Sequence, residues 1–360
     1  MERVLSIEDS SPWGWALAPL IPLASLYGLA MQARSALYAR GLLTQHFLPC
    51  RVISIGNLTV GGTGKTPVVI ALASALRERG RRVGVVSRGY KRRSADAIVE
   101  VSDGRSVRGD PGETGDEPLL IAQRCPGVPV AVGADRPSVG RYLIERYHID
   151  TLIMDDGYQH MALRRDTNIL VLDAGAPFGN GYLLPRGRLR EPLSAMARAT
   201  VVLVTRASQG GRLDDLKAAV RSAAPAVPIW VTDFALSAVV QVGGSTSVEP
   251  SVLKGKRVLA VSGIGYPESF RQLLAAAGAT VAEHCVFPDH HAYSREDVQR
   301  IRQVAERAGA GRIVTTEKDA VKLAQIIDEV TKKEVAIWAV RIDLTWREGF
   351  DEWTRVVLNG

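Results

Sequence analysis

A glycine-rich run, TVGGTGKT at residues 59–66, dictates the local fold around it. It follows a short β-type run at residues 51–55 and precedes an apolar, helix-like segment at residues 68–76. Strand, glycine-rich loop, GKT and helix is the order of a phosphate-binding loop. Backbone N–H groups in such a loop point at phosphate oxygens, and the N-terminus of the next helix adds positive potential. The sequence therefore predicts a site for a nucleoside triphosphate.

Each position of this loop has an expected role. Lys65 is expected to reach the β- and γ-phosphates, and Thr66 to place its hydroxyl on Mg²⁺. Thr59 stands where the usual pattern has glycine, but the remaining glycines still supply positions that tolerate φ > 0. An ordinary glycine-rich turn is the alternative, and the GKT triplet with both flanks favours the phosphate site. The expected nucleotide-binding residues are Thr59, Gly61, Gly62, Thr63, Gly64, Lys65 and Thr66.

Composition limits the class of protein. The chain has 360 residues, of which 46% are hydrophobic and 23% charged, as in a globular protein long enough for two domains. The net charge of +7 favours an anionic partner. Aromatic residues make up only 6%, with no interleaved basic stripe, so we expect no nucleic-acid partner. Three scattered cysteines indicate a reducing compartment without a disulfide framework.

The N-terminal segment differs from the rest, because residues 10–33 carry no charge. Its core, residues 13–31, is about as long as the ~20 apolar residues that a membrane-spanning helix needs. Pro19 and Pro22 would break such a helix, and Trp13, Trp15 and Tyr27 favour the headgroup layer. A buried helical hairpin is the alternative. We expect residues 1–45 to form a membrane-associated helical segment on the cytoplasmic face, with the basic residues Arg34 and Arg40 suited to anionic lipid.

The rest of the chain alternates strand-like and helix-like runs, which predicts an α/β fold of the P-loop NTPase type: a mostly parallel sheet flanked by helices. Residues 46–235 form the expected core, with strands near 82–87, 128–133, 151–154, 168–172, 200–205 and 229–232. Residues 236–251 are polar and irregular, and are expected to be a hinge. Residues 252–360 are expected to form a smaller α/β domain with a C-terminal tail.

Carboxylates follow one of the expected strands. Asp155 and Asp156 come directly after the run at residues 151–154, where an aspartate of a P-loop protein organises Mg²⁺. Gln159 and His160 continue this loop at the edge of the sheet where open α/β folds bind ligands. A structural turn is the alternative for the aspartate pair.

Further candidate groups lie elsewhere. Asp116 and Glu117 precede a helix-like run, where a helix cap is the alternative to a chemical role. His290 and His291 follow Asp289 and suggest a general base or, less completely, a metal site. Arginines in loops after strands suggest a second anionic site beside the triphosphate, the alternative being solvated loop charges; they are Arg88, Arg136, Arg186, Arg188 and Arg190.

Together these motifs resemble the lipid A 4'-kinase family, also called tetraacyldisaccharide 4'-kinase. The resemblance rests on seven ordered blocks, which are GNLTVGGTGKTP, SRGY, GDEP, DDGYQH, LLPRGRLREP, FPDHHAY and TTEKDAVKL. It implies transfer of the γ-phosphate of ATP, with Mg²⁺, to the 4'-hydroxyl of a tetraacylated glucosamine disaccharide 1-phosphate. The product would be lipid IVA of lipid A biosynthesis, made at the cytoplasmic face of the bacterial inner membrane.

The resemblance also implies roles for single residues. Asp116 matches the candidate base, and His290 matches the histidine that orients it; Lys65 joins them as a catalytic group. Asp155 matches a metal-binding carboxylate together with Thr66, and Glu191 is a further candidate for the metal site. The implied substrate-binding residues are Arg88, Arg136, Asp156, Gln159, His160 and Arg190.

Three other classes of protein remain open. A dimerising nucleotide switch with a GGxGKT loop would carry lysine before the glycine pair, where this chain has Val60. A GTPase would carry an Asn-Lys-x-Asp motif, of which Thr316-Glu317-Lys318-Asp319 is only a distant echo. A soluble small-molecule P-loop kinase would have no use for the apolar N-terminal segment.

Overall fold

A computed structural model describes residues 15–90, 92–94, 96–244, 246–327 and 336–358. Its strands are β1 (Arg51–Gly56), β2 (Val83–Ser87), β3 (Val99–Asp103), β4 (Pro129–Val132), β5 (Thr151–Asp155), β6 (Thr167–Asp173), β7 (Val201–Thr205), β8 (Ile229–Gln241), β9 (Ser247–Val248), β10 (Arg257–Ser262), β11 (Thr280–Val286), β12 (Arg312–Thr316) and β13 (Ile337–Glu348). Its α-helices are α2 (Ile21–Ala39), α3 (Lys65–Glu78), α4 (Pro111–Thr114), α5 (Asp116–Arg124), α6 (Arg136–Tyr147), α7 (Leu213–Ala223), α8 (Pro267–Ala276), α9 (Arg295–Arg307), α10 (Glu317–Leu323) and α12 (Phe350–Trp353). Short 3₁₀ segments are η1 (Trp15–Leu20), η2 (Leu193–Arg198) and η3 (Pro250–Leu253), and η4 (Thr354–Leu358) is a short π-helix.

The described strands form one continuous sheet in the order β11-β10-β12-β13-β8-β7-β6-β1-β5-β2-β4-β3, with β9 beside β8. Pairing is parallel except for β3 with β4, β8 with β13 and β8 with β9. The mostly parallel sheet expected from the alternating runs is confirmed. Because parallel strands end at the same edge, the loops after β1, β2 and β5 meet there, which is where such sheets bind ligands.

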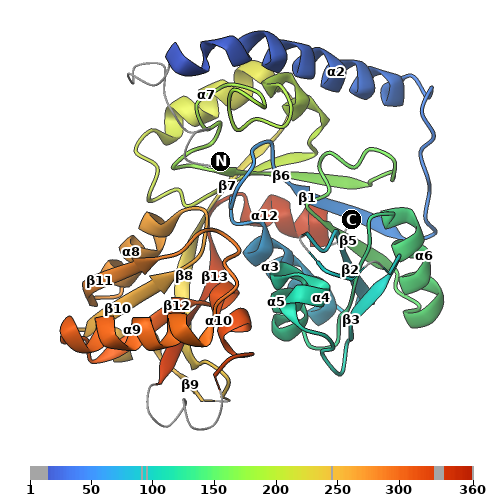
Figure 1. Cartoon of the computed structure of the whole chain (residues 1–360). Coiled ribbons are helices and arrows are strands. Elements are labelled where there is room, and N and C mark those ends of the chain that lie inside the picture. The colour runs from blue at the N-terminus through green and yellow to red at the C-terminus, as the bar shows by residue number, and fades with distance from the viewer. Residues whose placement is uncertain (1–14, 91, 95, 245, 328–335, 359–360) are drawn as a thin grey trace.

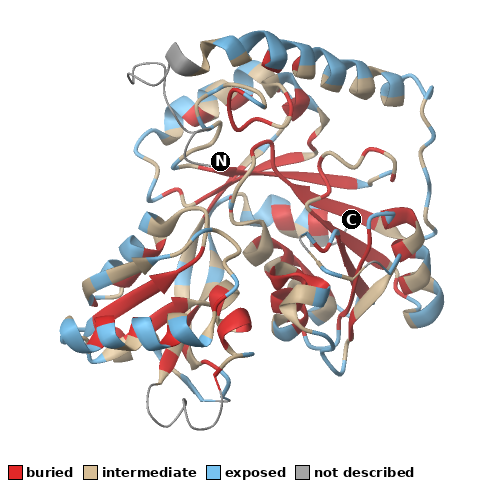
Figure 2. Ribbon diagram, viewed as in Figure 1, coloured by how far each residue is buried: buried red, intermediate tan, exposed pale blue. Residues whose placement is uncertain are grey.

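Helices cover both faces of the core sheet (Figure 1). Neighbouring residues of a strand point to opposite faces. Accordingly Val85 packs with the apolar side chains of α3 and α5, whereas Val86 packs with those of α6. The second half repeats this arrangement around β10, β11 and β12, with α8 on one face and α9 on the other. Figure 2 shows the strands of both halves as the buried centre of the molecule.

Strands β8 and β13 join the two halves as a long antiparallel ribbon, paired from Val231–Glu348 to Gln241–Trp338. The prediction of an irregular segment from residue 236 is therefore wrong for residues 236–241, because these residues continue strand β8. The C-terminal end also differs from the expected tail of the smaller domain. Trp353 and Val357 lie in the apolar cluster of the first half, and Arg51 donates a hydrogen bond to the Val357 carbonyl at 2.7 Å.

Helix α2 lies along one side of the molecule as its outermost layer (Figure 1). Pro19 lies in η1 and Pro22 in the first turn of α2, where a missing N–H does no harm. No helix among the described residues is long and apolar enough to cross a membrane. Tyr27, which was expected to favour the headgroup layer, is half-buried, and its hydroxyl donates to the Arg190 carbonyl at 2.9 Å. Residues 1–14, with Trp13, lie outside the described part.

Candidate active site

A cavity of about 1860 Å³ opens between the two halves, at the edge where the core strands end. The loop of residues 60–67 lines one side, and residues from the loop after β11 and from α10 line the opposite side. Three of the described non-glycine residues that line this cavity have a left-handed backbone. They are Asp156, Arg206 and His290, with φ of 50°, 53° and 61°. Such conformations cost energy and cluster at functional sites.

The glycine-rich loop has the shape of a phosphate cradle. Gly61 and Gly64 have φ of 108° and 81°, and α3 begins directly after at Lys65. Neighbouring segments hold the loop from outside: Thr205 Oγ1 donates to the Thr63 carbonyl at 3.0 Å, and Arg188 donates to the Val60 carbonyl at 2.8 Å. The loop and the first turn of α3 line the cavity, which is the arrangement in which backbone N–H groups bind an anion.

Lys65 and Thr66 line the cavity, but Thr59 lies beneath the loop. Lys65 Nζ is 3.1 Å from Asn57 Oδ1 and 3.4 Å from Asp156 Oδ1. Its ammonium is therefore already oriented toward the carboxylates after β5. Thr59 is 3% exposed and forms a backbone bridge with Leu189, so its side chain supports the loop from below.

The two aspartates after β5 have different surroundings. Burial, and then the charge of Asp156, raises the pKa of Asp155, whose Oδ2 accepts a hydrogen bond from Ser87 at 2.9 Å. Burial opposes ionisation of Asp156 as well, but Lys65 and Arg190 together hold its pKa well below the ordinary value. Arg190 lies 2.9 Å from Asp156 Oδ2. Asp155 lines the cavity and offers carboxylate oxygens, the type of ligand that Mg²⁺ prefers.

Basic and polar side chains line the cavity beside the loop. Gln159 is fixed by its donor contact to the Asn57 carbonyl at 3.0 Å. Burial, and then nearby arginines including Arg136, lowers the pKa of His160 to about 4, so its imidazole is neutral at pH 7. Among the described residues, His160 Nε2 and Arg136 Nε are buried without a hydrogen-bond partner. The other residues predicted to bind the substrate also line the cavity; they are Arg88, Asp156, Gln159 and Arg190.

Across the cavity, Asp116 and His290 form the expected pair. His290 Nδ1 lies 3.0 Å from Asp116 Oδ2 and 3.1 Å from Oδ1. Burial opposes the charge on each group, but the bond to His290 and the nearby Lys318 hold the pKa of Asp116 well below its ordinary value. Burial likewise opposes protonation of His290, but Asp116 and Glu117 raise the pKa of its imidazole. The carboxylate of Asp116 is 5% exposed and lies behind His290, which lines the cavity.

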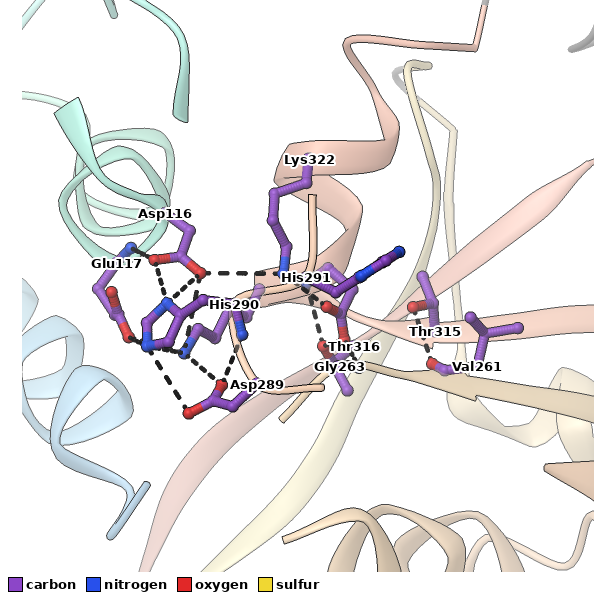
Figure 3. A network of polar contacts seen from close by, with 12 residues as sticks. Asp116, Glu117, Val261, Gly263, Asp289, His290, His291, Thr315, Thr316 and Lys322 are labelled. Carbon is purple, nitrogen blue, oxygen red and sulfur yellow. Dashed lines mark hydrogen bonds and ion pairs between the residues drawn. The ribbon is translucent and has the colours of Figure 1, made fainter. Parts of the chain in front are cut away.

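The carboxylates around this pair meet two lysines that the sequence interpretation did not single out (Figure 3). Lys318 Nζ lies 2.7 Å from Glu117 Oε1 and 3.1 Å from Asp289 Oδ1. Lys322 lies one helical turn further along α10. Both lysines lie in the block TTEKDAVKL, which carries part of the family resemblance but does not by itself indicate that they meet Asp116.

Glu191 is not brought together with Thr66 and Asp155. It is 2% exposed, and Arg198 holds its carboxylate at 2.8 Å. Both residues line a separate pocket of about 270 Å³ beneath α2, with Met31, Ser35 and Ala39. This geometry lends no support to the expected role of Glu191 in metal binding, which stays a prediction.

A phosphate loop, a carboxylate after the neighbouring strand and a buried aspartate–histidine pair across one cavity define a P-loop phosphotransferase. The sequence profile of the tetraacyldisaccharide-1-P 4'-kinase family matches residues 16–359. The chain belongs to this family.

Curated relatives agree along most of the chain. The tetraacyldisaccharide 4'-kinase of Syntrophus aciditrophicus is 43% identical over 330 residues, which are 88% of this chain and 86% of the relative. That of an Anaeromyxobacter species is 44% identical over 337 residues, 93% of this chain and 89% of the relative. The crystal structure of the "apo" form of LpxK from Aquifex aeolicus in complex with ATP superposes with a TM-score of 0.74 at 30% identity, over 96% of this chain and 99% of that one.

Proposed function

We propose that this chain is an ATP-dependent kinase that phosphorylates the 4'-hydroxyl of tetraacylated glucosamine disaccharide 1-phosphate, giving lipid IVA for lipid A biosynthesis. The observation that carries the proposal is that one cavity is lined by both the phosphate loop with Lys65 and His290, whose Nδ1 lies 3.0 Å from Asp116. Family membership supplies the substrate class. The chemistry required is positioning and charge neutralisation around a transferred phosphoryl group.

The phosphate loop and the first turn of α3 are proposed to hold the ATP phosphates through backbone N–H groups and Lys65. Thr66 and Asp155 are the residues proposed to hold Mg²⁺, because both line the cavity and offer oxygen ligands beside the loop. When bound, Mg²⁺ neutralises charge on the phosphate oxygens. Lys65 stays near Asp156 until phosphate is present, so its ammonium is pre-oriented for the transferred group.

Asp116 and His290 are proposed to take the proton of the 4'-hydroxyl as a pair. A sugar hydroxyl is a weak nucleophile at neutral pH, so a base is needed within hydrogen-bond reach of it. Asp116 is ionised, since its pKa is held low, and its contact with His290 Nδ1 fixes the orientation of the carboxylate. Titration of so closely coupled groups belongs to the pair.

The basic lining is proposed to bind the lipid substrate. Arg88, Arg136 and Arg190 give the cavity wall a positive charge that suits the 1-phosphate. Arg136 and His160 both line this wall, and the guanidinium of Arg136 offers N–H donors to phosphate oxygens. Asp156 and Gln159 complete the set by fixing Arg190, through contacts of 2.9 Å and 3.4 Å.

Helix α2 is proposed to lie on the cytoplasmic surface of the inner membrane, which keeps the acyl chains of the substrate in lipid. Leu26 and Leu29 on its outer side are 65% and 63% exposed, and most of that side is exposed in Figure 2. Such a face binds the lipid interface in proportion to its apolar area. We expect Leu26→Asp with Leu29→Asp to abolish co-sedimentation with anionic vesicles, whereas Val107→Asp, at another exposed apolar site, should not.

The test of the function is a phosphotransfer assay in detergent micelles with radiolabelled tetraacyl disaccharide 1-phosphate and ATP. We expect product with the wild-type chain and a loss of about 10²-fold or more in Lys65→Ala and Asp116→Ala. Activity that survives Asp116→Ala would keep the kinase and discard Asp116 as the base. A folded wild-type chain that binds ATP but transfers nothing to this acceptor would overturn the kinase and favour a nucleotide switch.

A further inference from the structure

Two lysines of α10 lie close to one carboxylate oxygen of Asp116, the proposed base. Lys318 Nζ lies 3.8 Å and Lys322 Nζ 3.9 Å from Asp116 Oδ2, the same oxygen that is 3.0 Å from His290 Nδ1. Residues four apart on a helix lie on one face, so both ammonium groups approach Asp116 together. Figure 3 shows Asp116 on the ribbon of the first half and Lys322 on that of α10. The proposed base therefore takes its counter-charges from the other half of the molecule.

Lys318 sits among all the carboxylates of this cluster. Besides Glu117 and Asp289, its Nζ is 3.4 Å from His290 Nε2. Asp116, Glu117 and His290 bring ligand atoms within 4.8 Å of one another, as a metal site would. The ammonium of Lys318 already supplies the positive charge at this position. Burial opposes that charge, but Glu117 and the two aspartates raise the pKa of Lys318, so it stays a cation.

The side chain of Lys322 is more deeply buried than that of Lys318. Its side chain is 9% exposed, and its Nζ is 2.9 Å from Asp319 Oδ1 and 5.3 Å from the centre of the Tyr293 ring. Asp319 is itself fixed, because its Oδ2 accepts hydrogen bonds from Gly263 N at 2.9 Å and Thr316 Oγ1 at 2.7 Å. A buried ammonium is costly unless anions surround it. Asp319 and Asp116 are the anions that Lys322 meets.

The C-terminal end of α5 also contacts α10 through charged side chains. Glu317, the first residue of α10, pairs with Arg124, the last residue of α5, and Arg341 of β13 lies 3.1 Å from Glu317. The two helices belong to different halves, joined otherwise by the β8–β13 ribbon. The position of α10 against α5 therefore decides whether the lysines reach Asp116.

We propose that Lys318 and Lys322 are positioning residues for Asp116, which hold it as an anion facing His290 only while α10 is docked on α5. This inference rests on the proposed function, since it assumes that Asp116 acts as the base. ATP brings several negative charges into the cavity, and these oppose a second anion nearby. The two ammonium groups offset that repulsion, because charge pairs in a buried site are only weakly screened. Docking of α10 on α5 thus brings the two ammonium groups to Asp116 and keeps it ionised.

A double-mutant cycle separates this role from a structural one. Lys322→Met is made in the wild-type chain and in an Asp116→Asn background, and kcat and KM for ATP are measured with thermal unfolding as a check of folding. Lys217→Met is the matched control: Lys217 pairs with Glu348 at 2.8 Å and is 15% exposed, but lies outside the cavity. Lys318→Arg keeps the charge and serves as the conservative variant.

We expect Lys322→Met to lower kcat by between about tenfold and hundredfold, as misplacement of a catalytic group does, with KM for ATP within about threefold. In the Asp116→Asn background the same substitution should have no effect, Lys318→Arg should retain most activity, and Lys217→Met should change neither constant. An equal loss in both backgrounds, or no loss in the wild-type chain, would overturn the proposal. Absence of product from the wild-type chain would refute the proposed function instead.

A second readout needs no turnover. Imidazole ¹⁵N spectra follow the titration of His290. The groups that face this imidazole are the carboxylates of Asp116, Glu117 and Asp289, the ammonium of Lys318 and, at 5.6 Å, the ring of Tyr90. Since Lys318 lowers the pKa of His290, we expect Lys318→Met to raise the pH at which this imidazole loses its proton. Lys217→Met should leave that pH unchanged. An unmoved His290 titration in Lys318→Met would refute the arrangement even in an inactive protein.

Discussion

Gly64 is the position in the phosphate loop where a single methyl group should do most harm. Its φ of 81° is left-handed, and a Cβ built there would lie 2.7 Å and 2.8 Å from two ring atoms of Phe234. The left-handed backbone costs a non-glycine residue about 1–2 kcal/mol. Crowding against a packed ring adds about 1–3 kcal/mol. We therefore expect Gly64→Ala to lower the free energy of unfolding by about 2–5 kcal/mol.

Gly62 provides the matched control in the same loop. A Cβ at Gly62 meets no atom within 4 Å, and its φ is not left-handed. Gly62→Ala should therefore change the free energy of unfolding by no more than about 0.5 kcal/mol. Urea unfolding without nucleotide, followed by tryptophan fluorescence, measures both variants. Adding Phe234→Leu to Gly64→Ala should recover the crowding part but not the backbone part. The reasoning fails if Gly64→Ala unfolds at the same urea concentration as Gly62→Ala.

Three further predictions concern charged groups. Asp155→Asn should raise the Mg²⁺ concentration needed for half-maximal turnover, and an unchanged requirement would place the metal elsewhere. Glu191→Gln should lower the free energy of unfolding by about 1–3 kcal/mol, because Arg198 loses its buried carboxylate; unfolding identical to wild type would contradict this. The pKa of His160 falls to about 4 on folding, so between about pH 6.5 and pH 4 the unfolded chain binds a proton that the folded chain does not. The free energy of unfolding should therefore decline as pH falls from about 6.5 toward 4, and should decline less in His160→Gln.

Much of the site was predictable because it is local in the chain. The phosphate loop depends on eight consecutive residues and their flanks, and Asp155 follows its strand directly. Strand β8 shows the opposite case. Residues 236–241 border a glycine- and serine-rich stretch at residues 243–247 that suggests a hinge, but they pair with β13, about one hundred residues away in the chain. Strand propensity depends on such partners, and a local pattern does not contain them.

The residues alone indicated a nucleotide-binding α/β protein, since loop geometry and strand periodicity follow from neighbours in the chain. The resemblance added the kinase family, which the comparisons confirm. Folding decided which charges meet. Asp116 and His290 are 174 residues apart in the chain, and Lys322 reaches the same carboxylate from a third segment. Glu191 instead lies with Arg198, away from the loop. Electrostatic interactions depend on distance and burial, which exist only once the halves have packed together.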